Sequence, residues 1–212
     1  MDQIIYLSYF LNEKTPAYGG EEGSIVFDRV KSIANGDTSN NLKLTFPNHI
    51  GTHVDFPFHF NLDGKKGSDY PADFWVFNSV GFIQCDVDSI EEHLSGLPTD
   101  IECLILKTGF ASNRGNEVYW KEQPVIKSYL ANVFKEKFPK LRLFGFDMIS
   151  LTSKLDRQEG KLAHIGFLIE NDILILEDMN LENLSNTPST VIISPLQLEG
   201  ADGGPCSVIA IM

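Results

Sequence analysis

The sequence predicts a strand-rich α/β or α+β domain with few helices. Short β-branched and aromatic runs, bounded by Gly, Pro, Asn and Asp, dominate the chain, and only two segments show helical spacing. No internal repeat or linker divides the 212 residues, so we expect a single domain over 1–212. The pattern alone does not give the order of the strands.

Nine runs are expected to form strands, because each is rich in residues that suit a pleated, half-buried surface. These runs are "IIYLSY" (4–9), "SIVF" (24–27), "LKLTF" (42–46), "GFIQCDV" (81–87), "ECLILKT" (102–108), "LRLFGF" (141–146), "ILIL" (173–176), "STVIISPLQL" (189–198) and "CSVIAI" (206–211). Turn-forming residues stand between them, which keeps the predicted strands short.

Two segments have the apolar spacing of a helix. In 123–137 the apolar residues recur three or four apart with lysines between them, Pro124 suits the first turn, and Pro139 ends the run. The second helix, 161–170, is shorter. It is expected to stop at Asn171, because asparagine tolerates the left-handed conformation of a C-cap.

Composition excludes several classes of partner. The formal net charge of −12 argues against nucleic acid and against an anionic membrane surface, because both require clusters of Lys and Arg. No stretch is apolar enough to span a bilayer, and the first 16 residues lack the features of a secretory signal. Cys85, Cys103 and Cys206 are widely spaced in apolar surroundings, so we expect buried free thiols and a cytoplasmic protein.

The stretch "NHIGTHVDFPFHF" (48–60) contains three of the five histidines. Its odd positions carry the polar or special residues His49, Gly51, His53, Asp55, Pro57 and His59. Its even positions carry Ile50, Val54, Phe56, Phe58 and Phe60, with Thr52 as the polar exception. Since successive side chains of a strand point to opposite faces, this register predicts one face of imidazole and carboxylate and one apolar face. Glycine and proline together exclude a helix here.

Four ionisable groups on one face of a buried strand are costly unless something compensates them. A divalent cation does so, and neutral imidazole with carboxylate is the usual ligand set for zinc or manganese. The alternative for any single strand histidine is a satisfied core or surface residue. Pro57 is expected to end the strand ladder, so His59 need not point where His49 and His53 point.

The segment "HIGTHVDFPFHF" resembles the H-x-G-T-H-x-D-x-P-x-H-F signature of the cyclase-like metal-dependent hydrolases, which include the bacterial kynurenine formamidases and the isatin hydrolases. Three further segments resemble that family in order and spacing: "LILKTGF" (104–110), "FGFDMISL" (144–151) and "SPLQLEGADGGP" (194–205). The resemblance covers nearly the whole chain. It implies a swivelling β/β/α domain, consistent with the many predicted strands.

The resemblance also implies a set of metal ligands, namely His49, His53, Asp55, His164 and Glu177. The first three would hold one ion, while Asp55 and Glu177 would bridge to a second ion that His164 completes. Two Zn²⁺ ions are expected, with Mn²⁺ as the alternative. From the residues alone, His164 could equally be a histidine on a helix surface, and Glu177 has Asp178 beside it as a solvated alternative.

Two more residues take roles by resemblance. His59 would lie outside the ligand set and transfer protons, and Tyr18 would pack against a substrate ring where relatives usually carry Trp. The alternative for Tyr18 is an exposed loop tyrosine beside two glycines. His93 has no such support and is interpreted as a surface residue.

The chain departs from the family pattern near its end. Many relatives continue with Pro-x-Arg, where this chain has Pro205, Cys206 and Ser207. Tyr70, Phe74 and Trp75, in the region after His59, could be pocket wall or core, and for most of them core is favoured.

The chemistry that fits is metal-dependent hydrolysis of an amide C–N bond by a metal-bound hydroxide, with His59 as the proton shuttle. An arylformamidase that converts N-formylkynurenine to kynurenine and formate is the first expectation, so the partner is a small aromatic amide. An isatin-hydrolase-like enzyme that opens a cyclic amide is the alternative within the class. A non-catalytic metal-binding protein is the alternative outside it. The resemblance further implies a homodimer or homotetramer.

Overall fold

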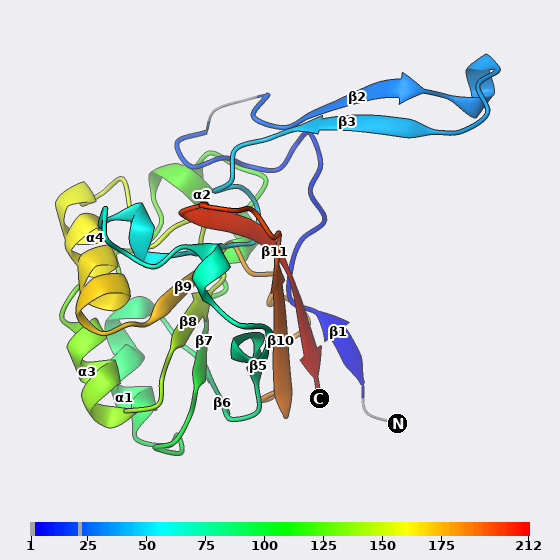
Figure 1. Cartoon of the computed structure of the whole chain (residues 1–212). Helices are drawn as coiled ribbons and strands as arrows, with labels where there is room; N and C mark the ends of the chain where they lie inside the picture. Colours follow the sequence, from blue (N-terminus) through cyan, green and yellow to red (C-terminus); the bar gives the residue numbers. More distant parts are fainter. Residues whose placement is uncertain (1–2, 21–22) are drawn as a thin grey trace.

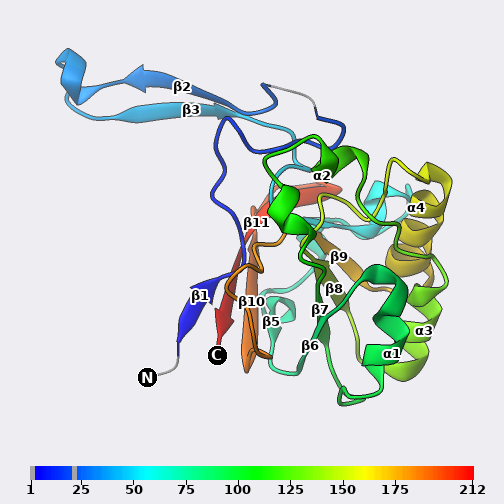
Figure 2. The same cartoon turned by 180° about the vertical axis from the view of Figure 1, so that it is seen from behind.

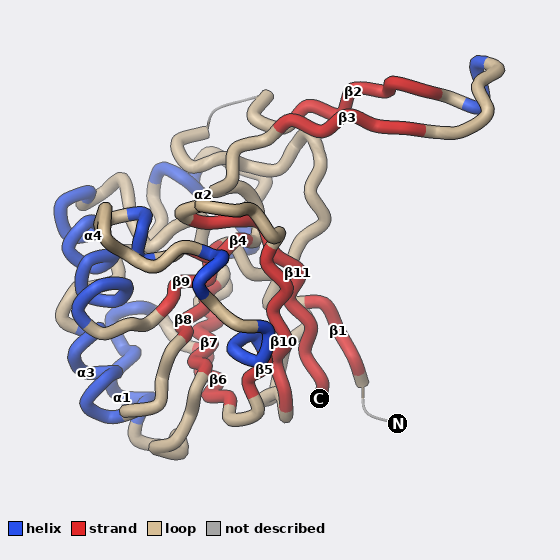
Figure 3. Tube along the Cα trace, in the orientation of Figure 1, coloured by secondary structure: helices blue, strands red, loops and turns tan. Residues whose placement is uncertain are grey.

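The computed structural model of the protein describes residues 3–20 and 23–212, and within them nine strands form one mixed sheet (Figures 1 and 3). Its order is β5-β10-β11-β4-β9-β8-β7-β6, and β1 also pairs with β11. These strands are β1 (Ile4–Tyr6), β4 (His53–Asp55), β5 (Val76–Phe77), β6 (Val80–Gln84), β7 (Cys103–Lys107), β8 (Leu143–Phe146), β9 (Leu174–Glu177), β10 (Thr190–Pro195) and β11 (Gly203–Ile211). Separately, β2 (Val26–Lys31) and β3 (Asn41–Thr45) form a hairpin.

One half of the sheet is parallel. Strands β6, β7, β8 and β9 run side by side in the same direction, joined through segments that contain helices. The helices are α1 (Ile90–Leu94), α2 (Val118–Lys121), α3 (Leu130–Lys137) and α4 (Arg157–His164). Figures 1 and 2 show α1, α3 and α4 gathered on the side of the sheet away from β1 and β10. The carboxyl ends of the parallel strands therefore share one edge, where open α/β sheets bind their ligands.

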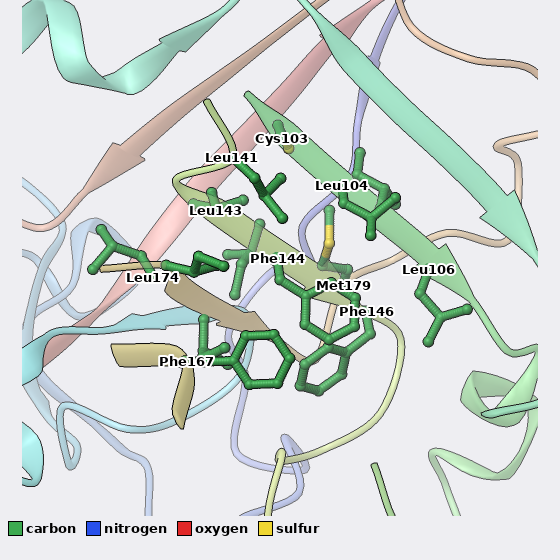
Figure 4. Close-up of a cluster of buried hydrophobic side chains, with 14 of the residues drawn as sticks. Cys103, Leu104, Leu106, Leu141, Leu143, Phe144, Phe146, Phe167, Leu174 and Met179 are labelled. Atoms are coloured by element: carbon green, nitrogen blue, oxygen red, sulfur yellow. The ribbon is translucent and has the colours of Figure 1, made fainter. Parts of the chain in front are cut away.

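The core between the parallel strands and their helices combines phenylalanine rings with leucine and methionine side chains (Figure 4). The rings of Phe144 on β8 and Phe167 stack with centroids 5.3 Å apart, and Phe134 on α3 meets Phe144 edge-on at 5.1 Å. All three side chains are fully buried. Since burial of one such ring contributes about 1.5–3 kcal/mol, these contacts fix the helices against the sheet.

The antiparallel half is organised by β11. Its first residues, Gly203 to Pro205, pair with β4, and the rest of the strand lies between β10 and β1. Strand β4 has only three residues, all buried, and it is hydrogen-bonded to β11 on one side and to β9 on the other. This short strand joins the two halves of the sheet.

Each of the nine predicted runs contains a strand, and the strand-rich character with few helices is confirmed. The helix predicted over 123–137 is shorter and comprises only α3, so Pro124 does not open it. The reason is tertiary: the Gln123 side-chain amide donates to the carbonyls of Ser150 (2.7 Å) and Thr152 (2.8 Å), which ties this segment to a neighbouring loop.

The second predicted helix begins earlier than expected. The Asp156 side chain caps α4 by accepting from the Glu159 backbone N–H at 3.0 Å, and the helix continues as a π-helical segment, Ile165–Glu170. The helical segment ends at Asn171, as predicted. The left-handed conformation expected there was wrong, because Asn171 has φ −117° and the left-handed residue is the next one, Asp172, with φ 53°. π-helical turns occur frequently beside functional residues, and here the turn follows His164 directly.

A buried ion pair fastens the loops at the carboxyl edge. Arg114 donates to the two carboxylate oxygens of Asp178 through Nε (2.8 Å) and Nη2 (2.6 Å), and the Tyr119 hydroxyl donates to the same group at 2.6 Å. Asp178 is 1% exposed and has φ 49°, a strained conformation for a residue with a side chain. It is therefore not the solvated carboxylate that the sequence left open, and its partners hold the chain directly after Glu177.

We expect Arg114→Ala to lower the free energy of unfolding by about 3 kcal/mol, because it leaves the buried Asp178 carboxylate without its cation. Urea unfolding followed by circular dichroism measures the change. Lys121→Ala is the control, since it removes an exposed i,i+4 ion pair with Glu117 and should leave stability almost unchanged. Equal losses in the two variants would contradict the structural role of Arg114.

Candidate functional site

A cavity of about 310 Å³ opens at the carboxyl edge of the parallel strands. It is lined by every residue that the sequence and the resemblance singled out, namely Tyr18, His49, His53, Asp55, His59, His164 and Glu177. These residues come from segments as far apart in the sequence as 18 and 177. The fold therefore brings the whole predicted set together, while the individual roles stay predictions.

His53 and Asp55 lie on one face of β4, as the alternating register predicted. Glu177, at the end of β9, is the register partner of His53. His53 Nε2 lies 3.4 Å from Asp55 Oδ1 and 3.4 Å from Glu177 Oε2. All three side chains are at most 6% exposed, so two carboxylates and an imidazole share a buried space.

His164 approaches the same carboxylates from the end of α4. Its Nε2 lies 3.4 Å from Asp55 Oδ2 and 3.6 Å from Glu177 Oε1, and its Nδ1 lies 2.8 Å from the Gly160 carbonyl. His53 repeats this arrangement, with Nδ1 2.8 Å from the Gly51 carbonyl. In the neutral form of each ring, a backbone carbonyl that accepts from Nδ1–H leaves the lone pair on Nε2, on the side of the carboxylates. Metal-binding histidines are commonly oriented in this way.

His49 reaches the cavity differently from the prediction, whereas the break in the strand before His59 was expected from Pro57. The extended strand expected over 48–60 is limited to β4, because Gly51 has φ 60° before it and Pro57 starts a 3₁₀ turn, Pro57–His59, after it. The His49 ring turns back so that Nδ1 lies 2.8 Å from Asp55 Oδ1. His59 stacks on His49 with ring centroids 4.1 Å apart.

Asp202 contacts two site histidines and was not predicted from the sequence to do so. Its Oδ2 lies 2.8 Å from His59 Nδ1 and 3.1 Å from His49 Nε2, and Asn48 donates to its Oδ1 at 2.6 Å. The signal was present in the Gly-Ala-Asp segment that resembles the family, but the partners lie more than 140 residues earlier.

Ser150 and Asp147 support the site from the strand ends. The Ser150 hydroxyl (3.2 Å) and the Leu151 backbone N–H (2.5 Å) donate to Glu177 Oε1. Asp147 accepts from the Thr108 hydroxyl at 2.6 Å and from two backbone N–H groups, so it ties the end of β7 to the end of β8. The Asp-x-x-Ser segment therefore holds Glu177 in place through Ser150, while the Thr-Gly segment fixes the neighbouring strand ends through Asp147.

Opposite charges at close range dominate the electrostatics of the site. Burial alone would lower the pKa of His53, but the hydrogen bond and charge of Asp55, with the charge of Glu177, outweigh it and raise the pKa to about 9. The same competition raises the pKa of His164 to about 10. Burial would raise the pKa of Asp55, yet its hydrogen bonds to three histidines hold it well below the usual range. The buried carboxylates thus attract cationic charge.

The residues present fit a divalent metal. Ligand atoms of His53, Asp55 and Glu177 lie within 4.8 Å of one another, and so do those of His49, Asp55 and His59. Imidazole nitrogen and carboxylate oxygen are the donors that zinc and manganese accept. Asp55 belongs to both groups.

The remaining predicted residues divide between the cavity and other surfaces. Tyr18 lines the cavity with 39% of its surface exposed. Tyr70, Phe74 and Trp75 pack against the core and do not line this cavity. Ser207, where relatives often have arginine, is exposed on β11 and lies outside the lining.

His93 and the three cysteines, for which no functional role was predicted, lie outside the cavity lining. His93 is exposed on α1, as expected. All three cysteines are free; Cys103 is buried, whereas Cys85 and Cys206 are half-buried. No helix in the described part of the chain is long and apolar enough to cross a membrane.

Comparison with known proteins supports this description. A profile of the family described as "Putative cyclase" matches residues 5–153. The kynurenine formamidase of Bacillus mycoides is 33% identical over 213 residues, covering 98% of this chain and 96% of that protein. That of Bacillus cereus is 33% identical over 173 residues, covering 79% of this chain and 78% of that protein.

The chain belongs to the cyclase family. Isatin hydrolase A from Labrenzia aggregata, solved with benzyl benzoate, superposes with a TM-score of 0.82 at 19% identity, covering 100% of this chain and 94% of that one. A potential metal-dependent hydrolase with cyclase activity superposes with a TM-score of 0.75 at 18% identity, covering 99% and 98%. The expected strand-rich cyclase fold is therefore confirmed.

Zinc binding should strengthen as pH rises from about 6 to 9. The metal needs neutral imidazoles, yet His53 and His164 hold protons up to pKa values of about 9 and 10, so the ion must displace those protons. The affinity should rise by up to about tenfold per pH unit for each proton released. Competition with a chromophoric chelator measures it, and Asp55→Ala, without the shared carboxylate, should lose the binding throughout. An affinity independent of pH would contradict the proton competition.

Proposed function

We propose that this protein hydrolyses amide C–N bonds and that its substrate is an aryl formamide such as N-formyl-L-kynurenine. The observation that carries the proposal is a buried imidazole–carboxylate cluster that shares its cavity with the half-exposed His59, whose ring is paired with Asp202. Relatives at 33% identity that bear the name kynurenine formamidase support the choice of substrate class. The products would be formate and an aromatic amine.

The ligand set that we propose is the one implied by the resemblance. His49, His53 and Asp55 would hold one ion, and Glu177 and His164 would hold a second with Asp55 as the shared group. A divalent ion there supplies polarisation of the amide carbonyl and activation of water. The fixed orientations of His53 and His164 support this set, because both present Nε2 to the carboxylates.

In this proposal His59 carries the protons. Asp202 stays ionised, since burial would raise its pKa but the hydrogen bonds from His59 and His49 lower it to about 2. A carboxylate only accepts, so it fixes the proton on His59 Nδ1 and leaves Nε2 free. Nε2 would take the proton of the attacking water and return it to the departing nitrogen as the C–O bond forms and the C–N bond breaks.

Tyr18 would set the fit of the aromatic ring. It lines the same cavity as the proposed ligands, and its π-face suits an aryl group. Where relatives usually carry Trp, a tyrosine offers a smaller face and a hydroxyl. A cavity of about 310 Å³ suits a small ligand rather than a polymer.

The decisive experiment is hydrolysis of N-formyl-L-kynurenine by protein that has been stripped of metal and reloaded with Zn²⁺ or Mn²⁺. We expect turnover only after reloading. Isatin, a cyclic amide, is the comparison substrate under the same conditions. Turnover of isatin alone would replace the formamidase proposal with a ring-opening amidase. If protein that is shown to bind metal hydrolyses neither substrate, the proposal of a hydrolase fails and a non-catalytic metal-binding protein takes its place.

We expect His59→Ala to lower kcat by about 100-fold or more, because general acid–base catalysis contributes about 10²–10⁴-fold. Steady-state kinetics with N-formyl-L-kynurenine gives kcat, and elemental analysis shows whether the variant keeps its metal. His93→Ala is the matched control, since that histidine is exposed on α1. Parent-like turnover by His59→Ala would eliminate the proton-transfer role. Loss of metal with loss of activity would make His59 a ligand.

A further inference from the structure

Two cations adjoin the cavity on the side of Tyr18. Arg157, the first residue of α4, donates a hydrogen bond to the Tyr18 hydroxyl, and Lys154 Nζ donates to the Gly19 carbonyl at 3.0 Å. Tyr18 lines the cavity with 39% of its surface exposed, so it stands where the cavity opens to solvent. The two cations therefore lie just outside the lining, at its entrance.

The lining itself carries the opposite charge. Asp55 and Glu177 belong to it, whereas no described residue of the lining is a lysine or an arginine. Tyr18 connects the two regions: burial raises its pKa, the charge and hydrogen bond of Arg157 oppose the rise, and the charge of Glu177 adds to it. A ligand that lies along Tyr18 would thus have buried carboxylates at one end and cations at the other.

Neither cation is neutralised by an acidic neighbour. Within the part of the chain that the structure describes, Arg157 and Lys154 form no ion pair. Glu117, an acidic residue within range of the Lys154 charge, is itself paired with Lys121 at 2.6 Å. Since an arginine has five N–H donors and a lysine has three, both keep donors free for a ligand. In a chain with a net charge of −12, two such cations at one opening favour an anion there.

We propose that Arg157, together with Lys154, recognises an anionic substituent of the substrate, so that the cavity selects aryl amides that carry a carboxylate. The inference rests on the proposed function for the place of the amide, which meets the buried cluster. The carboxylate of N-formyl-L-kynurenine then accepts from Arg157 at the entrance, because a planar guanidinium binds a carboxylate through two parallel hydrogen bonds. The Tyr18 hydroxyl holds that guanidinium beside the wall on which the aryl ring packs.

The test compares two ligands that differ by one carboxylate, L-kynurenine and its decarboxylated analogue kynuramine. Isothermal titration calorimetry on the zinc-loaded protein gives both dissociation constants, and their ratio measures the preference for the carboxylate. We expect the parent to bind L-kynurenine about tenfold more tightly or better, because hydrogen bonds between charged groups are the strong ones. Arg157→Gln should remove most of this preference, and Arg157→Gln with Lys154→Gln should abolish it.

Lys161→Gln is the matched control, since Lys161 is exposed on the same helix and does not line the cavity. It should keep the parent's ratio, and circular dichroism checks that all variants fold. If Arg157 and Lys154 only fastened the loop at Gly19, their loss would weaken both ligands equally and leave the ratio unchanged, which would overturn the proposal. A parent that binds both ligands equally would overturn it too.

The binding measurement separates this inference from the proposed function. A protein that prefers L-kynurenine through Arg157 but does not hydrolyse N-formyl-L-kynurenine would support the anion site and refute the formamidase. Hydrolysis of N-formyl-L-kynurenine with equal kcat/KM in the parent and in Arg157→Gln would support the formamidase and refute the anion site.

Discussion

Two buried carboxylates, Asp55 and Glu177, impose the arrangement around which the rest of the site is built. Each is at most 2% exposed, and a carboxylate at such depth is costly unless it is paired or bound to a cation. The chain meets this requirement with histidines from both sides, His53 from β4 and His164 from α4. The sheet topology brings the two carboxylates together, because β4, which carries Asp55, pairs with β9, which ends in Glu177.

The backbone around β4 leaves room for the side chains packed around Asp55 and Glu177. Gly51 takes the left-handed conformation, and a side chain on it would collide with Leu11. Gly203, on the paired strand β11, lies so close to the His49 ring that a Cβ atom would clash with it. These two glycines let the imidazole of His49 fold back onto Asp55. The two ends of the signature segment therefore converge although the strand between them has only three residues.

The pattern of apolar and polar residues predicted the strands well, but it predicted the positions of only some of the site residues. The register of His53 and Asp55 followed from alternation, because β4 is a true strand with one face on the cavity. His49 and His59 do not follow that register, since a glycine bend and a 3₁₀ turn flank the strand. Asp202 and Ser150 had no recognisable role in sequence, because their function depends on partners brought close only by the folded sheet. The helix predicted over 123–137 is also shorter in the structure, because Gln123 contacts a loop that only the fold brings close.

The distribution of exposure distinguishes a working site from a structural one. Structural metal sites are closed by their ligands, whereas catalytic sites keep one side open. Here His53, Asp55, His164 and Glu177 are buried, while the side chains of His59 and Asp202 are 31% and 34% exposed. A half-exposed imidazole, held by its own carboxylate and stacked on His49, contributes little to a closed metal site. It stands where a substrate entering from solvent would meet the buried cluster, which is the position that a proton carrier requires.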